Sequence, residues 1–279
     1  MASLTQTSQQ FAQVITEAAG KKSITFDESK TMAAEVTTAS NVHGLIGVQT
    51  DLYRAPDGTC YVNARMNRRE SGARYSAMIR ENEKLIARLM ALAAERPATF
   101  DAYAALNYAH SIAVPTDNFQ SIVEVLDPRT VSQKPSYGSA DAIKVLLQNT
   151  ARSIVISVTV EGDTGGRIAR SFSQFFSGRA FRTTRSGAAV YRFNASLEME
   201  NADFGTNQRY KNVRYVLNVY AEDKDGIEVF SYAGEDRASR DTESEARQLA
   251  LRKIEASIAE PEENGFARAF NGYLSSLLE

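Results

Sequence analysis

The spacing of apolar side chains divides the chain into a mainly helical first half and a second half rich in strands. Apolar residues recur at helical spacing over residues 3–19 and 71–94, which predicts two amphipathic helices. Between them, residues 46–53 and 60–67 alternate apolar and polar positions on either side of the turn APDG, a pattern typical of a β-hairpin. One face of this hairpin is apolar, and we expect the helix over 71–94 to cover it.

Three more helices are expected before residue 152. Two of them, over 98–113 and 116–126, are separated by Pro115, because proline removes a helical hydrogen bond and disturbs the preceding turn. The third begins after Ser139, whose hydroxyl is a favourable N-cap.

From residue 152 onward the pattern favours strands. Residues 152–162 form a nearly continuous apolar run, which indicates a strand buried on both faces. Two later runs alternate cleanly, and Asp225-Gly226 favours a turn into a final strand. Helices are expected after the GDTGGR turn, after Thr242 and near the C-terminus. The positions predicted to face inward are Tyr191, Phe193, Ala195, Leu197, Met199, Val213, Tyr215, Leu217 and Val219.

Together these elements predict an α+β protein of two domains, each a small, mainly antiparallel sheet packed against helices. The first expected domain is residues 1–151, a hairpin with helices. The second is residues 152–260, with the order β-α-β-β-β-α, and residues 261–279 are expected to form a C-terminal helix. The aromatic stripe after the GDTGGR turn is expected to be core; it consists of Phe172, Phe175, Phe176 and Phe181.

Charge is balanced overall but uneven along the second half. The 279 residues carry a net charge of −2, so no global field attracts nucleic acid or an acidic membrane surface. Residues 152–214 hold ten Lys/Arg and five Asp/Glu, whereas residues 221–263 hold six and thirteen. This asymmetry can orient a partner or pair internally, and exposed internal pairs contribute about 0–1 kcal/mol each.

No catalytic motif occurs, so we expect a protein that is not an enzyme, with no catalytic, cofactor-binding or metal-binding residue and no cofactor. Cys60, His43 and His110 could form a zinc site only by converging from distant parts of the sequence. The segment from Asp223 to Gly226 resembles the start of a calcium loop but lacks the later acidic ligand.

Two further features have a functional and a structural interpretation. Arg65, Arg68 and Arg69 follow the hairpin, but nearby glutamates dilute them, and a solvated strand end is favoured over nucleic-acid binding. The GDTGGR segment precedes a predicted helix, where backbone N–H groups can hold an anion. A tight strand-to-helix turn is favoured there, because the Walker and G-x-G-x-x-G patterns are both incomplete.

The motifs DGTCYVNARMNR, SGRAFRTT and VRYVLN occur in this order and resemble the Lpp-twenty lipoprotein family, in its longer two-part form from spirochaete cell envelopes. The resemblance implies export with removal of a signal peptide, lipid attachment at an N-terminal cysteine, and a periplasm-facing place on an envelope membrane such as the outer membrane. Cys60 lies within a predicted strand and cannot be the lipidated residue, so we expect the natural chain to begin earlier.

We therefore expect a non-enzymatic cell-envelope lipoprotein that acts as an assembly scaffold or protein-interaction module. The second half also resembles small modules of envelope assembly factors. The expected partners are other envelope proteins or cell-wall components, together with the membrane through a lipid anchor absent from this sequence, and no nucleic acid. Two alternatives remain open: a periplasmic small-ligand-binding protein, with a cleft lined by residues 98–151, and a nucleic-acid binder.

Overall fold

Our computed structural model describes residues 46–127, 135–184, 188–202 and 210–278. The expected helix over residues 3–19 lies outside them. The chain forms two compact units: one comprises residues up to Glu81 together with Asn118–Gln133, and the other comprises Asn82–Asp117 together with Lys134–Glu279. The domain boundary expected at residue 151 lies within the second of these units. A division by contacts does not test whether each expected domain folds by itself, and the expected domain limits stay a prediction.

The first unit contains an antiparallel hairpin of β1 (Val48–Arg54) and β2 (Cys60–Met66). Among the residues that the structure describes, its base is packed, where the Ile46 amide donates a hydrogen bond of 2.6 Å to the Tyr75 hydroxyl. Farther out, Leu52 and Val62 are 63% and 49% exposed. The expected helix does not cover this face, because its apolar side chains pack elsewhere, as Tyr75 does against Phe119.

Helices α3 (Arg68–Glu95), α4 (Phe100–Leu126) and α5 (Ala140–Ser153) form the helical part of the chain. Within the second unit they share a core in which small alanines of α4 allow close helix approach. Ser139 caps α5 as expected, accepting a hydrogen bond of 3.2 Å from the Ala142 amide. The buried residues of this core include Ile86, Leu89, Ala102, Ala105, Ala109, Ala113 and Ile143.

The expected break at Pro115 is wrong, because α4 continues through it. The buried hydroxyl of Thr116 donates to the Ile112 carbonyl at 2.6 Å and accepts from the Asn82 side-chain amide at 2.9 Å. These side-chain bonds and the packing of α4 against its neighbours hold the helix together where proline removes one backbone donor.

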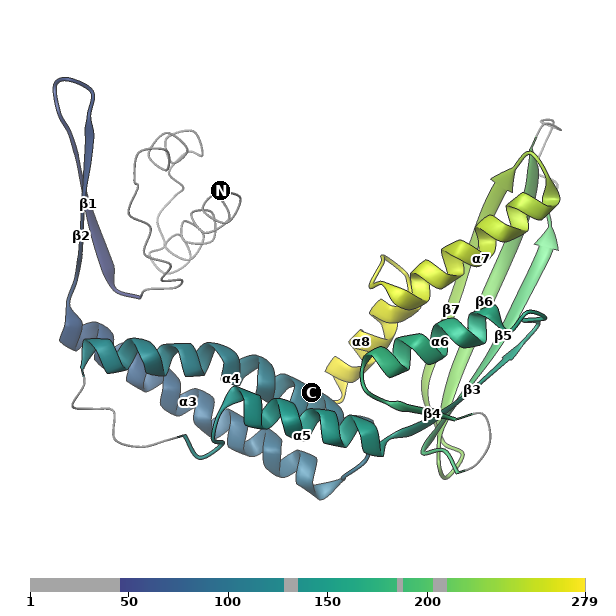
Figure 1. Cartoon of the computed structure of the whole chain (residues 1–279), viewed down its shortest axis with the longest axis horizontal. Helices are drawn as coiled ribbons and strands as arrows, with labels where there is room; N and C mark the ends of the chain where they lie inside the picture. Colours follow the sequence, from purple (N-terminus) through teal and green to yellow (C-terminus); the bar gives the residue numbers. More distant parts are fainter. Residues whose placement is uncertain (1–45, 128–134, 185–187, 203–209, 279) are drawn as a thin grey trace. The chain divides into compact units, whose positions relative to one another are not determined.

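The second unit is built around a five-stranded sheet in the order β4-β3-β5-β6-β7 (Figure 1). Strand β3 is parallel to β4 and β5, whereas the pairs β5–β6 and β6–β7 are antiparallel. The three-residue strand β4 was not predicted, since three residues carry no measurable period. The strands are β3 (Val155–Glu161), β4 (Arg182–Thr184), β5 (Tyr191–Asn201), β6 (Lys211–Asp223) and β7 (Glu228–Arg240).

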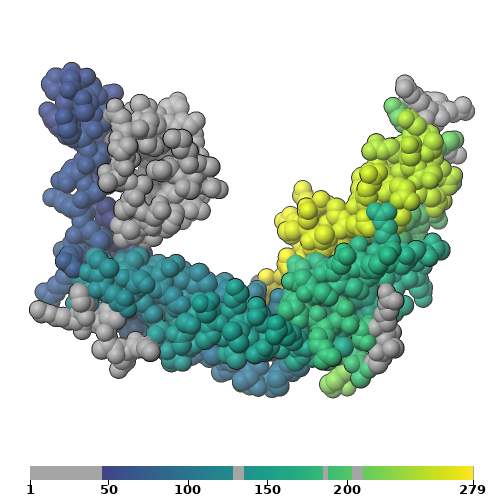
Figure 2. All heavy atoms as spheres, in the orientation of Figure 1, coloured from purple at the N-terminus to yellow at the C-terminus, as the bar shows by residue number. Residues whose placement is uncertain are grey.

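Helices α6 (Arg167–Gly178), α7 (Glu243–Ala259) and α8 (Phe266–Ser276) cover one face of this sheet, which we call the inner face. Figure 1 shows the three helices on the same side of the strands, and their spheres hide much of that side in Figure 2. We call the opposite face the outer face. The run over 152–162 is therefore buried mainly on one face and not on both, because Ser157 and Thr159 of β3 lie on the outer face.

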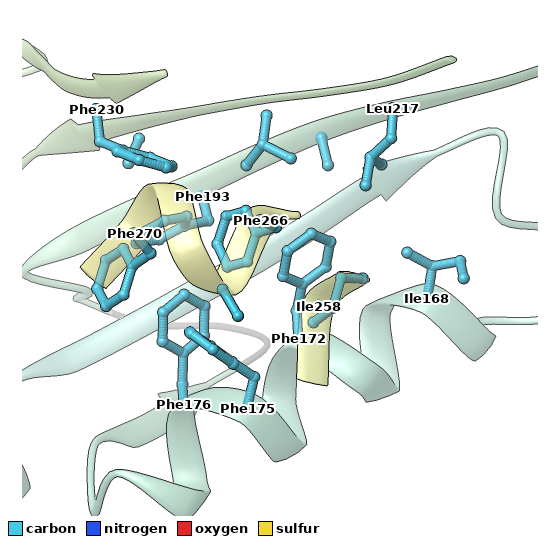
Figure 3. Packing of buried hydrophobic residues seen from close by; sticks show 14 of the residues in the cluster. Ile168, Phe172, Phe175, Phe176, Phe193, Leu217, Phe230, Ile258, Phe266 and Phe270 are labelled. Carbon is cyan, nitrogen blue, oxygen red and sulfur yellow. The ribbon is translucent and has the colours of Figure 1, made fainter. Parts of the chain in front are cut away.

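Aromatic rings fill the space between the helices and the inner face (Figure 3). Phe176 of α6 contacts Phe193 of β5, with ring centroids 4.7 Å apart. Phe266 and Phe270 of α8 pack against the same group, so residues 261–279 belong to this core. Such edge-on contacts favour aromatic packing beyond the burial of area.

The start of α4 joins this aromatic core. Phe100 stacks on Tyr191 of β5 with centroids 3.9 Å apart, and its amide donates to the Tyr191 hydroxyl at 3.0 Å. The expected fold class is confirmed: the chain is α+β, with helices packed against sheet. The expected inward residues of β5 and β6 are buried from Tyr191 to Leu197 and from Val213 to Val219, whereas Met199 is half-buried.

Replacing Leu217 with Asp is expected to unfold the second unit, because Leu217 is 2% exposed in the centre of the inner face and a buried, unpaired carboxylate is severely destabilising. Circular dichroism during thermal unfolding measures the effect. The matched control is Asn218→Asp, one residue along β6 on the exposed outer face. Equal stability of the two variants would mean that the register of β6 is wrong.

Candidate functional site

The hairpin β1–β2 presents two chemically different faces. On one face Leu52 lies opposite Val62, and both side chains are exposed. On the other face the rings of Tyr53 and Tyr61 lie 6.3 Å apart, and an ion pair of 3.5 Å joins Asp51 and Arg65. The hairpin therefore combines an apolar face around Leu52 and Val62, with Arg54 at its outer end, with a polar face that carries two tyrosines.

Exposure of this apolar face is unusual for a two-stranded hairpin. Such hairpins are marginally stable in water unless a further strand, helix or partner covers them, and grouped exposed apolar side chains commonly mark interaction surfaces. The alternation in β1 and β2 predicted the face itself. The exposure of this face was not predicted. The sequence shows that an amphipathic helix follows the hairpin, but it does not show that the apolar side chains of that helix pack against α4.

The arginines that follow the hairpin are used locally. Arg65 pairs with Asp51 on the polar face, and Arg68 donates to the Val125 carbonyl at 2.6 Å. Arg69 is exposed in the first turn of α3. These contacts fit the interpretation of a strand end better than that of a basic nucleic-acid surface, which needs basic groups gathered on one face.

The outer face of the five-stranded sheet is the second exposed surface. Its central rows are formed by hydroxyl and amide side chains such as Asn194 and Asn218, with Tyr220 44% exposed beside them. A shallow, open depression of about 330 Å³ lies over β6 and β7, lined by Asn218, Val219, Tyr220, Glu228, Ser231, Tyr232 and Ala233. Ligand pockets are enclosed and mainly apolar, so this depression suits a broad contact better than a small ligand.

The turn before α6 is structural. The carboxylate of Asp163 accepts hydrogen bonds from the amides of Arg167 and Ala169 at 3.0 and 2.9 Å. It thereby occupies the end of the helix where an anion would bind. Gly162 has a φ of +81°, and a Cβ there would lie 2.1 Å from the Leu197 carbonyl oxygen.

No group of three or more His, Cys, Asp or Glu side chains in the described part of the chain lies close enough to hold a metal ion. Cys60 is exposed in the hairpin, His110 is half-buried in α4, and His43 lies outside the described residues. The carboxylate of Asp223 accepts from the amides of Asp225 and Ile227, at 2.9 Å each. It therefore closes a β-turn, which accounts for the acidic segment at the end of β6.

Several buried tyrosines have raised pKa values. Burial raises the pKa of Tyr215, and nearby Asp236, which accepts from its hydroxyl at 3.5 Å, raises it further. Burial likewise raises the pKa of Tyr137, whose hydroxyl donates to Asp117 at 2.7 Å. Asp117 also accepts from the Ala140 amide at 2.8 Å. These carboxylates orient packing tyrosines and the start of α5.

Gly162→Ala is expected to lower the free energy of unfolding by more than about 1 kcal/mol, because a side chain there meets both a left-handed φ and a backbone oxygen. Urea unfolding of the whole chain provides the measurement. Gly165→Ala is the matched control in the same turn, since a Cβ at Gly165 has open space around it. Equal destabilisation by both changes would show that the turn has a different conformation.

Alkaline titration is expected to unfold the protein. The raised pKa of Tyr215 favours the neutral phenol in the folded state, so its contribution to stability is complete below the unfolded pKa of about 10 and is lost as pH rises above it. Tyrosinate absorbance and circular dichroism should then change together above about pH 10. Ionisation of every tyrosine before any loss of circular dichroism would contradict this packing.

No family model matches the sequence, and no curated protein matches it. None of the described helices is both long and apolar enough to cross a bilayer. Among solved structures, a minor lipoprotein from Acinetobacter baumannii is 9% identical, with a TM-score of 0.32, over 38% of this chain and 87% of that one. A candidate lipoprotein from Caulobacter crescentus CB15 is 14% identical, with a TM-score of 0.30, over 44% of this chain and 89% of that one. At this level of similarity the function has to be argued from the chain itself.

Proposed function

We propose that this chain is a non-enzymatic lipoprotein of the bacterial cell envelope that binds another envelope protein through the apolar face of its hairpin. The observation that carries the proposal is the exposure of Leu52 and Val62 side by side on β1 and β2. The resemblance of the sequence to Lpp-twenty lipoproteins supports the envelope location, with lipid anchoring and a periplasm-facing orientation as parts of the same proposal.

The chemistry of the hairpin favours a protein partner. Leu52 and Val62 offer an apolar centre, and Arg54 lies at the outer end of the same face, while the Asp51–Arg65 pair lies on the other face of the hairpin. Protein interfaces have the same division, with few charges at the centre and a polar rim. The bound partner is expected to contribute an apolar groove or strand edge, because either one removes this centre from water.

The other two functions have weaker support in the described residues. A small-ligand carrier was expected to use the segment 98–151, but its helices α4 and α5 pack around a core that includes Ala105, Ala109 and Ile143. Nucleic-acid binding was expected to use the arginines after the hairpin, and Arg65 and Arg68 already have local partners.

A photo-crosslinking side chain at position 52 tests the proposal in intact envelopes of the source bacterium. The expected result is one discrete protein adduct, which disappears when Val62→Asp places a charge on the same face. The same side chain at Asn63, on the polar face of the hairpin, serves as the matched control and should give no such adduct.

The captured protein must then bind the purified chain. Leu52→Asp should weaken this binding at least tenfold, because a charge at the centre of an apolar contact has to be desolvated, and Asn63→Asp should leave it unchanged. A crosslink from position 52 into residues 1–45 of the same chain would contradict the proposal, since the hairpin face would then be covered internally.

A further inference from the structure

The outer face of the sheet carries charges only near its four corners. Consider first the end of the sheet where β5 begins. There Arg182 of β4 and Arg192 of β5 form a basic corner, and Glu222 of β6 with its cross-strand neighbour Glu228 of β7 forms an acidic corner. Each corner carries two charges, and the two corners meet in the middle of this sheet end, where Arg192 lies directly opposite Glu222.

At the other end of the sheet the signs are reversed. The β3–β5 half is acidic there, with Glu161, Glu198 and Glu200 on the outer face. The β6–β7 half carries Arg214 and Arg237, and Glu235 neutralises one positive charge by pairing with Arg214 at 2.7 Å. The four corners therefore alternate in sign around the face.

The region between the corners is uncharged and exposed to different degrees. Most of its side chains are hydroxyls and amides, and the half-buried Val216 and the exposed Ala233 lie among them, so that charge is depleted at the centre of the surface and remains toward its rim. The polar members are Thr159, Asn194, Ser196, Asn218, Tyr220 and Ser231.

A face with alternating corners is complementary to itself. Take a two-fold axis that runs parallel to the strands between β5 and β6 and lies in the plane of contact. Rotation about this axis places β6 and β7 of one copy on β5 and β3 of the other, with the same strand ends together, and β4 extends beyond the edge of the partner sheet. Each basic corner then meets an acidic corner at both ends of the sheet, and the strands of the two sheets lie aligned, as in sheet-on-sheet packing.

The size of the face is sufficient for a weak dimer. The seven residues of β3 and the eleven of β5 in each copy lie opposite β7 and β6 of the other. With strands about 4.8 Å apart and a rise of about 3.3 Å per residue, this overlap offers about 600 Å² per copy, or about 1,200 Å² in total. This is the lower end of the range for specific interfaces. A polar contact of that size is expected to be reversible and sensitive to salt, because its charges lie at the solvent-exposed rim.

We propose that the outer face binds a second copy of this chain, sheet against sheet, with the two-fold axis between β5 and β6. The dimer uses a surface of the second unit that is distinct from the apolar face of the hairpin. It does not depend on the function proposed above.

Sedimentation equilibrium of the purified chain at low salt tests the dimer. The expected result is a monomer–dimer equilibrium that shifts toward monomer as salt increases. Arg182→Glu with Arg192→Glu should weaken dimerisation at least tenfold, because the changed corner then faces the acidic corner of its partner. Glu222→Arg with Glu228→Arg should do the same, with basic corners facing each other.

Mixing the two double variants should restore dimerisation as a heterodimer, because the altered acidic corner of one then meets the altered basic corner of the other. Arg252→Glu, on the exposed side of α7, and Leu52→Asp, on the hairpin, should leave the dimer unchanged. A monomer at every concentration, a dimer indifferent to both double variants, or no recovery on mixing would each overturn the proposal.

Discussion

The five-stranded sheet depends on one constraint, which is that the described helices α6, α7 and α8 all pack against the same face. The inner face is lined by alternating apolar residues of β5 and β6, and the aromatic rings of α6 and α8 fill the space above them. Burying these rings is the main favourable contribution to folding here, at about 1.5–3 kcal/mol for each fully buried large apolar side chain. The same alternation places polar side chains on the outer face, which no described helix covers. Packing and exposure are thus two results of one sequence pattern.

The sequence predicted this arrangement well where the period was long and clean. Phe193 and Leu217 lie in runs of strict alternation, so their inward positions followed directly from strand geometry, and the caps at Ser139 and Thr242 followed from their own side chains. Prediction failed where tertiary contacts decide. Pro115 lies within a continuous helix, where the neighbouring Thr116 bonds the Ile112 carbonyl and is itself held by Asn82 of α3, 34 residues away in sequence. No local pattern contains that information.

The candidate sites were predictable to a different degree. Alternation identified the apolar face of the hairpin, and the absence of catalytic motifs led to the expectation of a binding protein. Whether Leu52 is covered depends on which element packs against the apolar side chains of α3. That element is α4, and the sequence of the hairpin alone cannot show this. The corner charges of the outer face were also visible only as an uneven charge distribution along the chain. Their alternation around one face requires the strand order β4-β3-β5-β6-β7, which brings Arg192 beside Glu222 and Glu228.

Thiol reactivity along β6 tests the one-sided sheet most directly. In a Cys60→Ser background, single cysteines would replace Val216, Asn218 and Tyr220 on the outer face, and Leu217 and Val219 on the inner face. In dilute solution the three outer positions should react rapidly with a water-soluble reagent, and the two inner positions should react only when the protein unfolds. Equal reactivity at all five positions would contradict the account, because it would mean that β6 does not have one buried and one exposed face.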